Sequence, residues 1–198
     1  MKSHRNVLEK CPKMGCQIPP IVCLPTLSWT APATLHWSSM QLTLAHFGPT
    51  APKSGLKSHY DALTRLYLDR LQPYHPTHPE AFPTEAAFLA WLARPQSGKA
   101  NRTPVLPVLL DGSRGRALTS SELALWLGAR RDQGTQHLVF AIGPPDGWSP
   151  TALAAAGSGL LLSFGPITLP HELARLVLAE QLYRACTILA GHPYHSGH

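Results

Sequence analysis

The sequence contains little charge and no long hydrophobic run. Only 14% of its 198 residues are Asp, Glu, Lys or Arg, whereas 44% are hydrophobic. A chain of this length and composition can bury one sizeable core, and we expect one principal domain. No apolar run approaches the ~20 residues of a membrane-spanning helix, and the early stretch IPPIVCLP is too broken by proline for a signal-peptide core. These absences predict no membrane segment and favour a cytoplasmic protein.

Patterns typical of metal and nucleotide sites are also absent. Cys11, Cys16 and Cys23 have spacings that fit no paired CxxC zinc motif, and Cys186 lies within an apolar helical pattern, typical of a buried core cysteine. We therefore expect no metal site and no disulfide framework. Neither GxGxxG nor GxxxxGK[ST] occurs, which disfavours a standard dinucleotide or P-loop site.

The net charge of +6 is unevenly distributed. Residues 1–39 hold four basic residues and one acidic residue (4 − 1 = +3), which leaves 13 basic and 10 acidic residues (+3) for the rest of the chain. So weak an excess permits an RNA partner but does not indicate one, because a dedicated non-specific binder usually carries a clustered basic stripe.

Composition changes abruptly at Met40. Residues 1–39 have five prolines and no sustained periodicity. We expect them to be either a disordered extension or a segment upstream of the true start of translation at Met40. Residues 40–198 are the expected folded domain. Mass spectrometry of the native N-terminus distinguishes the two, because a native peptide from upstream of Met40 excludes the second.

From Met40 onward, short apolar runs alternate with helical patterns, which predicts an α/β fold with a parallel sheet. Proline makes residues 73–84 loop-like, with no strand placed there, and Pro107 suggests an edge position or a bulge for its strand. The predicted strands are Leu42–Gly48, Val105–Asp111, His137–Gly143 and Leu160–Gly165. The predicted helices run from about Ser54 to Leu71, from Glu85 to Ala93, from a capping box at Thr119 and Glu122, from an N-cap at Ser149, and from Glu172 to Ala190.

Three turns are candidates for holding a ligand, because ligands of parallel sheets bind beyond the carboxyl ends of the strands. They follow Asp111, Ile142 and Phe164, and read LLDGSRG, IGPPDGWSP and SFGPITLPH. Glycine lets a ligand approach the backbone closely, and proline stiffens the loop that receives it. Each of these turns taken alone is also consistent with an ordinary tight connection between a strand and a helix.

The second half of the chain carries a specific resemblance. FAIGPPDGWSP and ITLPHELARLVLAEQLYRACTILAGHPYH follow one another in the order and spacing of the ribosomal RNA large subunit methyltransferase H family, whose pattern runs I-G-G-P-[ED]-G, T-[LF]-P-H, L-x-E-Q-[LI]-Y-R-A and H-P-Y-H. The resemblance covers residues 40–198, strongly from Asp111 onward and weakly from about Pro73 to Thr103.

That resemblance implies a fold, an assembly and a reaction. The fold is of the SPOUT type, a parallel sheet flanked by helices with a C-terminal trefoil knot, one of the few exceptions to the rule against knots. Glu172–Ala190 is then partly core and partly the interface of a homodimer. The reaction transfers a methyl group from S-adenosyl-L-methionine to N3 of a pseudouridine in 23S rRNA, within the large ribosomal subunit.

The resemblance also assigns candidate cofactor residues in the three turns. They are Leu110, Asp111, Gly143, Pro144, Gly165, Pro166, Ile167, Thr168, Leu169 and Pro170. Pro144 stands where the family has a second glycine. Because proline has no amide donor, this position either contributes only its carbonyl and shape, or cofactor affinity has fallen. Gly165-Pro166 is a smaller departure from the pattern.

Near the methyl acceptor the resemblance places His171, Arg184, Tyr194 and His195. Arg184 could stabilise a developing anion or a phosphate, Tyr194 could stack on a base, and either histidine could accept the N3 proton. Each has a structural alternative: His171 as a helix-start residue, Arg184 as a partner of Glu180, and Tyr194 as a packed C-terminal cap. His192 is interpreted as structural.

Two other functions stay open at this point. The middle segment HPTHPEAFPTEAAF lacks the lysine and arginine usual in the family, which favours a SPOUT methyltransferase with a different RNA target. Pro144 motivates a ribosome-binding protein with impaired catalysis. Cofactor binding distinguishes the impaired ribosome-binding protein from both methyltransferases. Mapping of methylated nucleotides distinguishes the methyltransferase of the leading hypothesis from one with a different RNA target.

Overall fold

The protein was analysed as a computed structural model, which describes residues 40–48, 56–94, 105–157 and 159–195. All of them fall within one compact unit, residues 36–198. The expectation for residues 1–39 lies outside the described residues. Within the described ranges, no helix is both long and apolar enough to cross a membrane.

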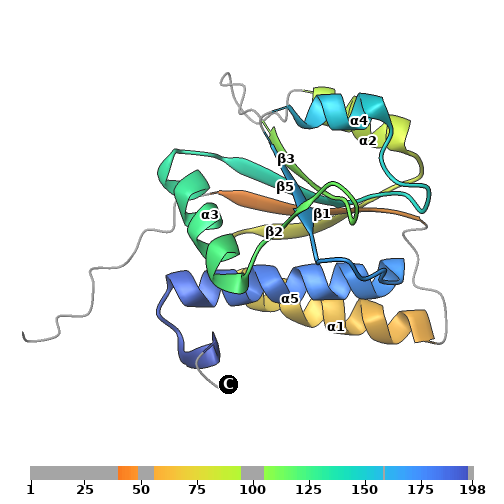
Figure 1. The fold of residues 1–198 in the computed structure, drawn as a ribbon. Helices are drawn as coiled ribbons and strands as arrows, with labels where there is room; N and C mark the ends of the chain where they lie inside the picture. The colour runs from red at the N-terminus through yellow and green to blue at the C-terminus, as the bar shows by residue number, and fades with distance from the viewer. Residues whose placement is uncertain (1–39, 49–55, 95–104, 158, 196–198) are drawn as a thin grey trace, which may run out of the picture. The chain divides into compact units, whose positions relative to one another are not determined.

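Strands and helices alternate along the chain, except that β4 directly follows β3 (Figure 1). The strands are β1 (Gln41–Phe47), β2 (Thr77–Phe82), β3 (Val105–Leu110), β4 (Arg116–Ala117), β5 (His137–Ile142) and β6 (Leu160–Ser163). The helices are α1 (Leu56–Leu71), α2 (Glu85–Ala93), α3 (Ser120–Asp132), α4 (Pro150–Ala156) and α5 (His171–Leu189), followed by the 3-10 turn η1 (Pro193–His195).

The strands form one six-stranded sheet in the order β2-β1-β5-β3-β6-β4, and every pairing is parallel. Helices α1, α3 and α5 cover one face, and α2 and α4 cover the other (Figure 1). Because both faces are covered, the central strands are apolar along their length, and all six residues of β5 are buried. The predicted α/β fold with a parallel sheet and flanking helices is confirmed.

Two helix starts follow the sequence signals that predicted them. The Thr119 hydroxyl accepts from the amide of Glu122, whose carboxylate accepts from the Thr119 amide, so the predicted capping box is present. Ser149 caps α4 by accepting from the amide of Ala152, and Pro150 follows as the first helical residue. Glu85 also accepts from the amide and hydroxyl of Ser149, which ties α2 to α4.

Proline misled the prediction in two places. Residues 77–82 form the strand β2 although Pro79 lies within it. An edge strand tolerates the missing amide, and β2 lies at the edge of the sheet, beside β1. For Pro107 the expectation of an edge strand or a bulge was wrong, because β3 lies between β5 and β6 and pairs with β5 without interruption. Pairing with β6 begins only at Val108, so among the described residues no strand pairs with Pro107 on that side.

The final helix is buried on one side by the rest of the chain. Leu178, Leu182 and Cys186 are inaccessible to solvent, and α5 packs on α1 and α3. The prediction of a buried core cysteine is confirmed for Cys186, and burial raises the pKa of its thiol to about 12. Other apolar residues of α5, such as Leu176 and Val177, are only half-buried.

Candidate functional site

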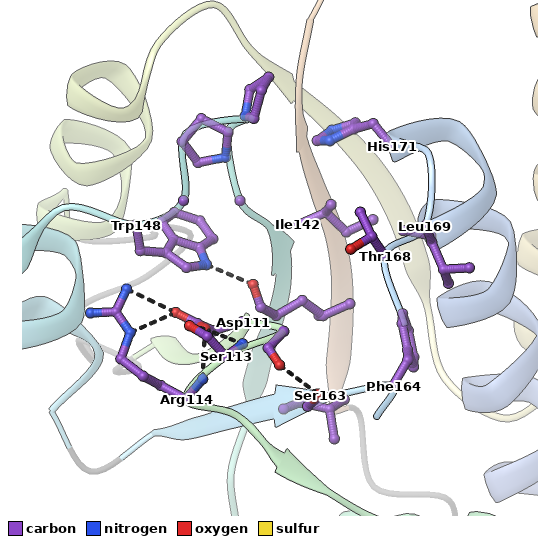
Figure 2. A pocket seen from close by; sticks show the side chains of 18 of the residues that line it. Asp111, Ser113, Arg114, Ile142, Trp148, Ser163, Phe164, Thr168, Leu169 and His171 are labelled. Carbon is purple, nitrogen blue, oxygen red and sulfur yellow. Dashed lines mark hydrogen bonds and ion pairs between the residues drawn. The ribbon is translucent and has the colours of Figure 1, made fainter. Parts of the chain in front are cut away.

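The three predicted turns meet at the carboxyl ends of three neighbouring strands. β5, β3 and β6 are neighbours, and the turns that leave their carboxyl ends, with the first turn of α5, line a pocket of about 670 Å³ (Figure 2). This volume lies within the ~300–1,000 Å³ range of small-molecule sites.

The turn after β3 is fixed by Asp111. One carboxylate oxygen accepts from the Ser113 amide (2.9 Å), the Ser113 hydroxyl (2.8 Å) and the Arg114 amide (2.9 Å), and the other accepts from the Arg114 guanidinium at 3.1 Å. Burial raises the pKa of Asp111, but these hydrogen bonds and the charge of Arg114 outweigh it, so the pKa is lowered overall. The carboxylate is ionised and directed at its own turn.

The turn after β5 is shaped by Trp148. The indole Nε1 donates to the carbonyl of Leu110 at 2.8 Å, and the ring packs against Phe47 and Phe88. A Cβ at Gly143 would lie only 2.9 Å from Nε1, so the close approach of the indole requires glycine there. Trp148 therefore joins the ends of β3 and β5.

Proline at position 144 is compatible with this turn. The Pro144 carbonyl accepts from the Gly147 amide at 2.9 Å, and Gly147 adopts a φ of +80°. The residue thus closes a tight turn through its carbonyl, while its ring fixes φ.

The turn after β6 passes along the pocket without regular secondary structure between Phe164 and Pro170. Ser163 is buried and its hydroxyl accepts from the Gly165 amide at 3.1 Å. Gly165 has a φ of +93°, which favours glycine. Ile167 and Thr168 are exposed, so this segment leaves backbone groups accessible to a ligand.

Most of the predicted cofactor residues line this pocket, and two do not. The lining predicted residues are Leu110, Asp111, Gly143, Pro144, Gly165, Ile167, Thr168 and Leu169; Pro166 and Pro170 lie outside the lining set. Sequence reasoning did not name Trp148, Ser163 or Phe164 as site residues, although all three lie in the turns IGPPDGWSP and SFGPITLPH that it singled out. A tryptophan between glycine and a helix cap was a signal for Trp148, but its partner Leu110 is distant in sequence.

Within a single chain, the four residues predicted to lie near the methyl acceptor do not lie close together. His171 begins α5 and lines the pocket, whereas Arg184 lies 13 residues further along the helix, roughly 20 Å away at 1.5 Å per residue. Tyr194 and His195 lie beyond the other end of α5, in η1.

Close to the start of α5, near His171, lie a basic side chain with its paired carboxylate and a second imidazole. Arg175, one turn along α5, forms an ion pair with Asp61 of α1. His46, at the carboxyl end of β1, is 9% exposed. Burial, followed by the charges of Arg175 and His171, lowers the pKa of His46 to about 4, so its imidazole is neutral at physiological pH.

Further along α5, Glu180 binds two of the other three residues, Arg184 and Tyr194. It accepts from Arg184 at 2.7 and 3.0 Å and from the Tyr194 hydroxyl at 3.1 Å, while the Arg184 guanidinium lies 5.0 Å from the Tyr194 ring centre. The pair expected in the structural alternative for Arg184 is therefore present, and Tyr194 also packs on Tyr183. Burial, a hydrogen bond with Tyr67 and the charge of Glu180 raise the pKa of Tyr194.

The chain is similar to known methyltransferases over most of its length. The family model described as "Predicted SPOUT methyltransferase" matches residues 40–195. A Koribacter versatilis protein named ribosomal RNA large subunit methyltransferase H is 47% identical over 159 residues, which cover 80% of this chain and 100% of that protein. The chain belongs to the ribosomal RNA large subunit methyltransferase H family.

A second relative bears the same name, and one solved structure is distantly similar. A Brucella ovis protein of the same name is 48% identical over 100 residues, which span 50% of this chain and 57% of that protein. Among solved structures, a ribosomal RNA small subunit methyltransferase E from Neisseria gonorrhoeae bound to S-adenosyl methionine matches with a TM-score of 0.41 and 13% identity, over 76% of this chain and 66% of that one. The resemblance read from the sequence motifs is thus confirmed by the family match.

Proposed function

We propose that this member of the methyltransferase H family transfers a methyl group from S-adenosylmethionine to N3 of a pseudouridine in 23S rRNA of the large ribosomal subunit. The observation that carries the proposal is the pocket at the ends of β5, β3 and β6, built from the family's motif turns in a chain that matches the family over residues 40–195.

The residues of this pocket fit S-adenosylmethionine. Apolar side chains of Leu110, Ile142, Leu162, Phe164 and Leu169 offer walls for the adenine ring. The irregular segment 165–168, exposed from residue 166 onward, can offer polar backbone groups, and Asp111 holds the first turn in place. The cofactor supplies an electrophilic methyl group on a sulfonium, and the protein has to present the acceptor nitrogen in line with it.

We infer that the catalytic site is completed across a homodimer. Within one chain, Arg184, Tyr194 and His195 are about one helix length from the pocket, so they reach an acceptor base only in the pocket of a second copy. Leu63 and Leu66 on α1 are 45% and 43% exposed, and Leu176 and Val177 on α5 are half-buried, so these two helices offer an apolar face for an isologous contact.

The trefoil knot is part of the same proposal. β6 lies between β3 and β4, and the turn from Asp111 to Gly115 joins those two strands. A Cβ at Gly115 would lie 2.5 Å from the Leu162 carbonyl oxygen, and the Asp111 amide donates to that oxygen. The turn therefore crosses the end of β6 closely, and this crossing supports a C-terminal segment that threads beneath it.

Mixed dimers test the composite site. Thr168→Trp fills the pocket, and His195→Gln alters the terminal turn of the other copy; each variant alone is expected to be nearly inactive on large ribosomal subunits. When equal amounts exchange subunits, heterodimers retain one intact site, and about a quarter of the parent activity should return. A mixture of His195→Gln with Arg184→Ala is the control and should stay inactive. If the first mixture also stays inactive although heterodimers form, the site lies within one chain.

A further inference from the structure

The last turn of the described chain is held in one conformation by backbone hydrogen bonds. Gly191, with a φ of +65°, donates to Ile188, and the His192 amide donates to the carbonyl of Thr187 at 2.9 Å. These two bonds form the Schellman motif that closes α5. His192 is therefore placed by the end of the helix, and η1 continues from it.

Two hydrogen bonds of His192 determine which ring nitrogens of His192 and His195 carry a proton. Its ring Nδ1 accepts from the Tyr194 amide at 3.1 Å, so this nitrogen carries no proton. Its carbonyl oxygen lies 2.8 Å from Nδ1 of His195. Because a carbonyl only accepts, Nδ1 of His195 carries the proton, and the lone pair of the neutral ring is on Nε2. His195 is exposed, so this lone pair is accessible to a substrate.

The two candidate histidines lie at opposite ends of α5. A base becomes an imidazolium when it accepts a proton, and a helix disfavours a cation at its N-terminal end. His171 is the first residue of α5, whereas His195 lies beyond the C-terminal end of the helix. The helix therefore disfavours proton uptake at His171, which leaves His195 as the candidate base.

Resting on the proposed function, we propose that His195 is the general base through Nε2, and that His192 is the positioning residue that fixes its tautomer. The N3–H bond of the pseudouridine breaks and its proton passes to Nε2 of His195. The electron pair on N3 forms the new bond to the methyl carbon as the carbon–sulfur bond breaks, and that bond's electron pair stays on sulfur. The His192 carbonyl keeps its hydrogen bond from Nδ1 and stabilises the imidazolium.

Nitrogen-15 NMR of the imidazoles in the full-length protein tests the tautomers without any substrate. His195 is expected with a protonated Nδ1 and an unprotonated Nε2, and His192 with the opposite pattern; the spectra of His195→Gln and His192→Gln assign the signals. A His195 ring protonated only at Nε2 would overturn the proposal. Because this result does not depend on methyl transfer, it separates a failure of the inference from a failure of the proposed function.

Kinetics with large ribosomal subunits test the two roles. His195→Gln should lower kcat by about 10²–10⁴-fold, the usual effect of removing general acid–base catalysis, whereas the matched variant His171→Gln should lower kcat far less. His192→Ala should lower kcat by about tenfold or more with KM unchanged, and His192→Asn, whose amide oxygen can accept from the Tyr194 amide, should restore most of it. If His171→Gln has the larger effect on kcat, or Asn restores nothing, the assignment is wrong.

Discussion

Replacing Gly115 with alanine is expected to destabilise the protein through the crossing of the first turn over β6. The added Cβ would lie 2.4 Å from the carbonyl oxygen of Asp111 and 2.5 Å from that of Leu162. Even close Cα–H···O contacts keep carbon and oxygen about 3.3 Å apart, so each oxygen would have to move by about 0.8–0.9 Å. Both oxygens belong to the backbone, so no side chain can rotate away to make room.

The expected loss follows from what this movement disturbs. Overpacking in a rigid environment costs about 1–3 kcal/mol. The Asp111 amide donates to Leu162 at 2.9 Å and the Gly115 amide donates to Asp111 at 3.0 Å, and weakening each bond costs about 0.5–1.5 kcal/mol. Alanine also restricts the unfolded chain, which offsets about 0.4–1 kcal/mol. The middle of these ranges predicts that the free energy of unfolding falls by about 3 kcal/mol.

Gly112→Ala in the same turn is the matched control. No atom lies within 4 Å of a Cβ at Gly112, and its φ is outside the left-handed region. Its free energy of unfolding should change by less than about 1 kcal/mol. Urea denaturation at one protein concentration measures both variants. The reasoning is refuted if Gly115→Ala is as stable as the parent, or if Gly112→Ala loses as much stability as Gly115→Ala.

Three further predictions concern the pocket and its surroundings. Trp148→Phe leaves the Leu110 carbonyl without its indole donor, so the free energy of unfolding should fall by about 1–3 kcal/mol. Calorimetry should also show weaker binding of S-adenosylmethionine. Unchanged affinity would mean that the indole does not shape the site. Pro144→Gly should cost about 0.5–1 kcal/mol without improving cofactor affinity, because the closing contact to Gly147 uses only the carbonyl; binding that appears only in the glycine variant would contradict this. His46 gains a proton near pH 6.5 in the unfolded chain but only near pH 4 in the folded protein, where the ring is buried. Between pH 7.5 and 5 the unfolded state therefore binds more protons than the folded state. His46 alone should lower the free energy of unfolding by about 2 kcal/mol over this range. In urea titrations at these two pH values, His46→Gln should remove that part of the fall, and a fall of the same size in the variant would show that another group causes it.

The sequence was informative about the fold wherever local chemistry decides the structure. The capping box at Thr119 and the cap at Ser149 with Pro150 are local interactions, and the structure has both. Prolines were misleading because their effect depends on which side of a strand has a neighbour. Pro79 is accommodated at the sheet edge, and Pro107 precedes the pairing of its strand with β6, and neither fact can be known before the strand order.

For the candidate site too, features set by the local sequence could be predicted, whereas contacts between distant residues could not. The three turns could be predicted because parallel strands end at a common edge, and β5, β3 and β6 are in fact neighbours. The contact between Trp148 and Leu110 spans 38 residues and depends on the register between strands, so no local pattern predicts it. The separation of His171 from Arg184 was accessible from the sequence, since the length of the predicted helix already sets a distance of about 20 Å.

The most direct test of the account is the position of the methyl group. Purified protein would be incubated with S-adenosylmethionine and with large ribosomal subunits or assembled ribosomes from a strain that lacks the gene for this protein. The modified nucleotides of 23S rRNA would then be mapped by mass spectrometry. The account predicts a single added methyl group, on N3 of a pseudouridine, and its loss in His195→Gln. Methylation of a different nucleotide, or no transfer by a protein that binds S-adenosylmethionine, would contradict it.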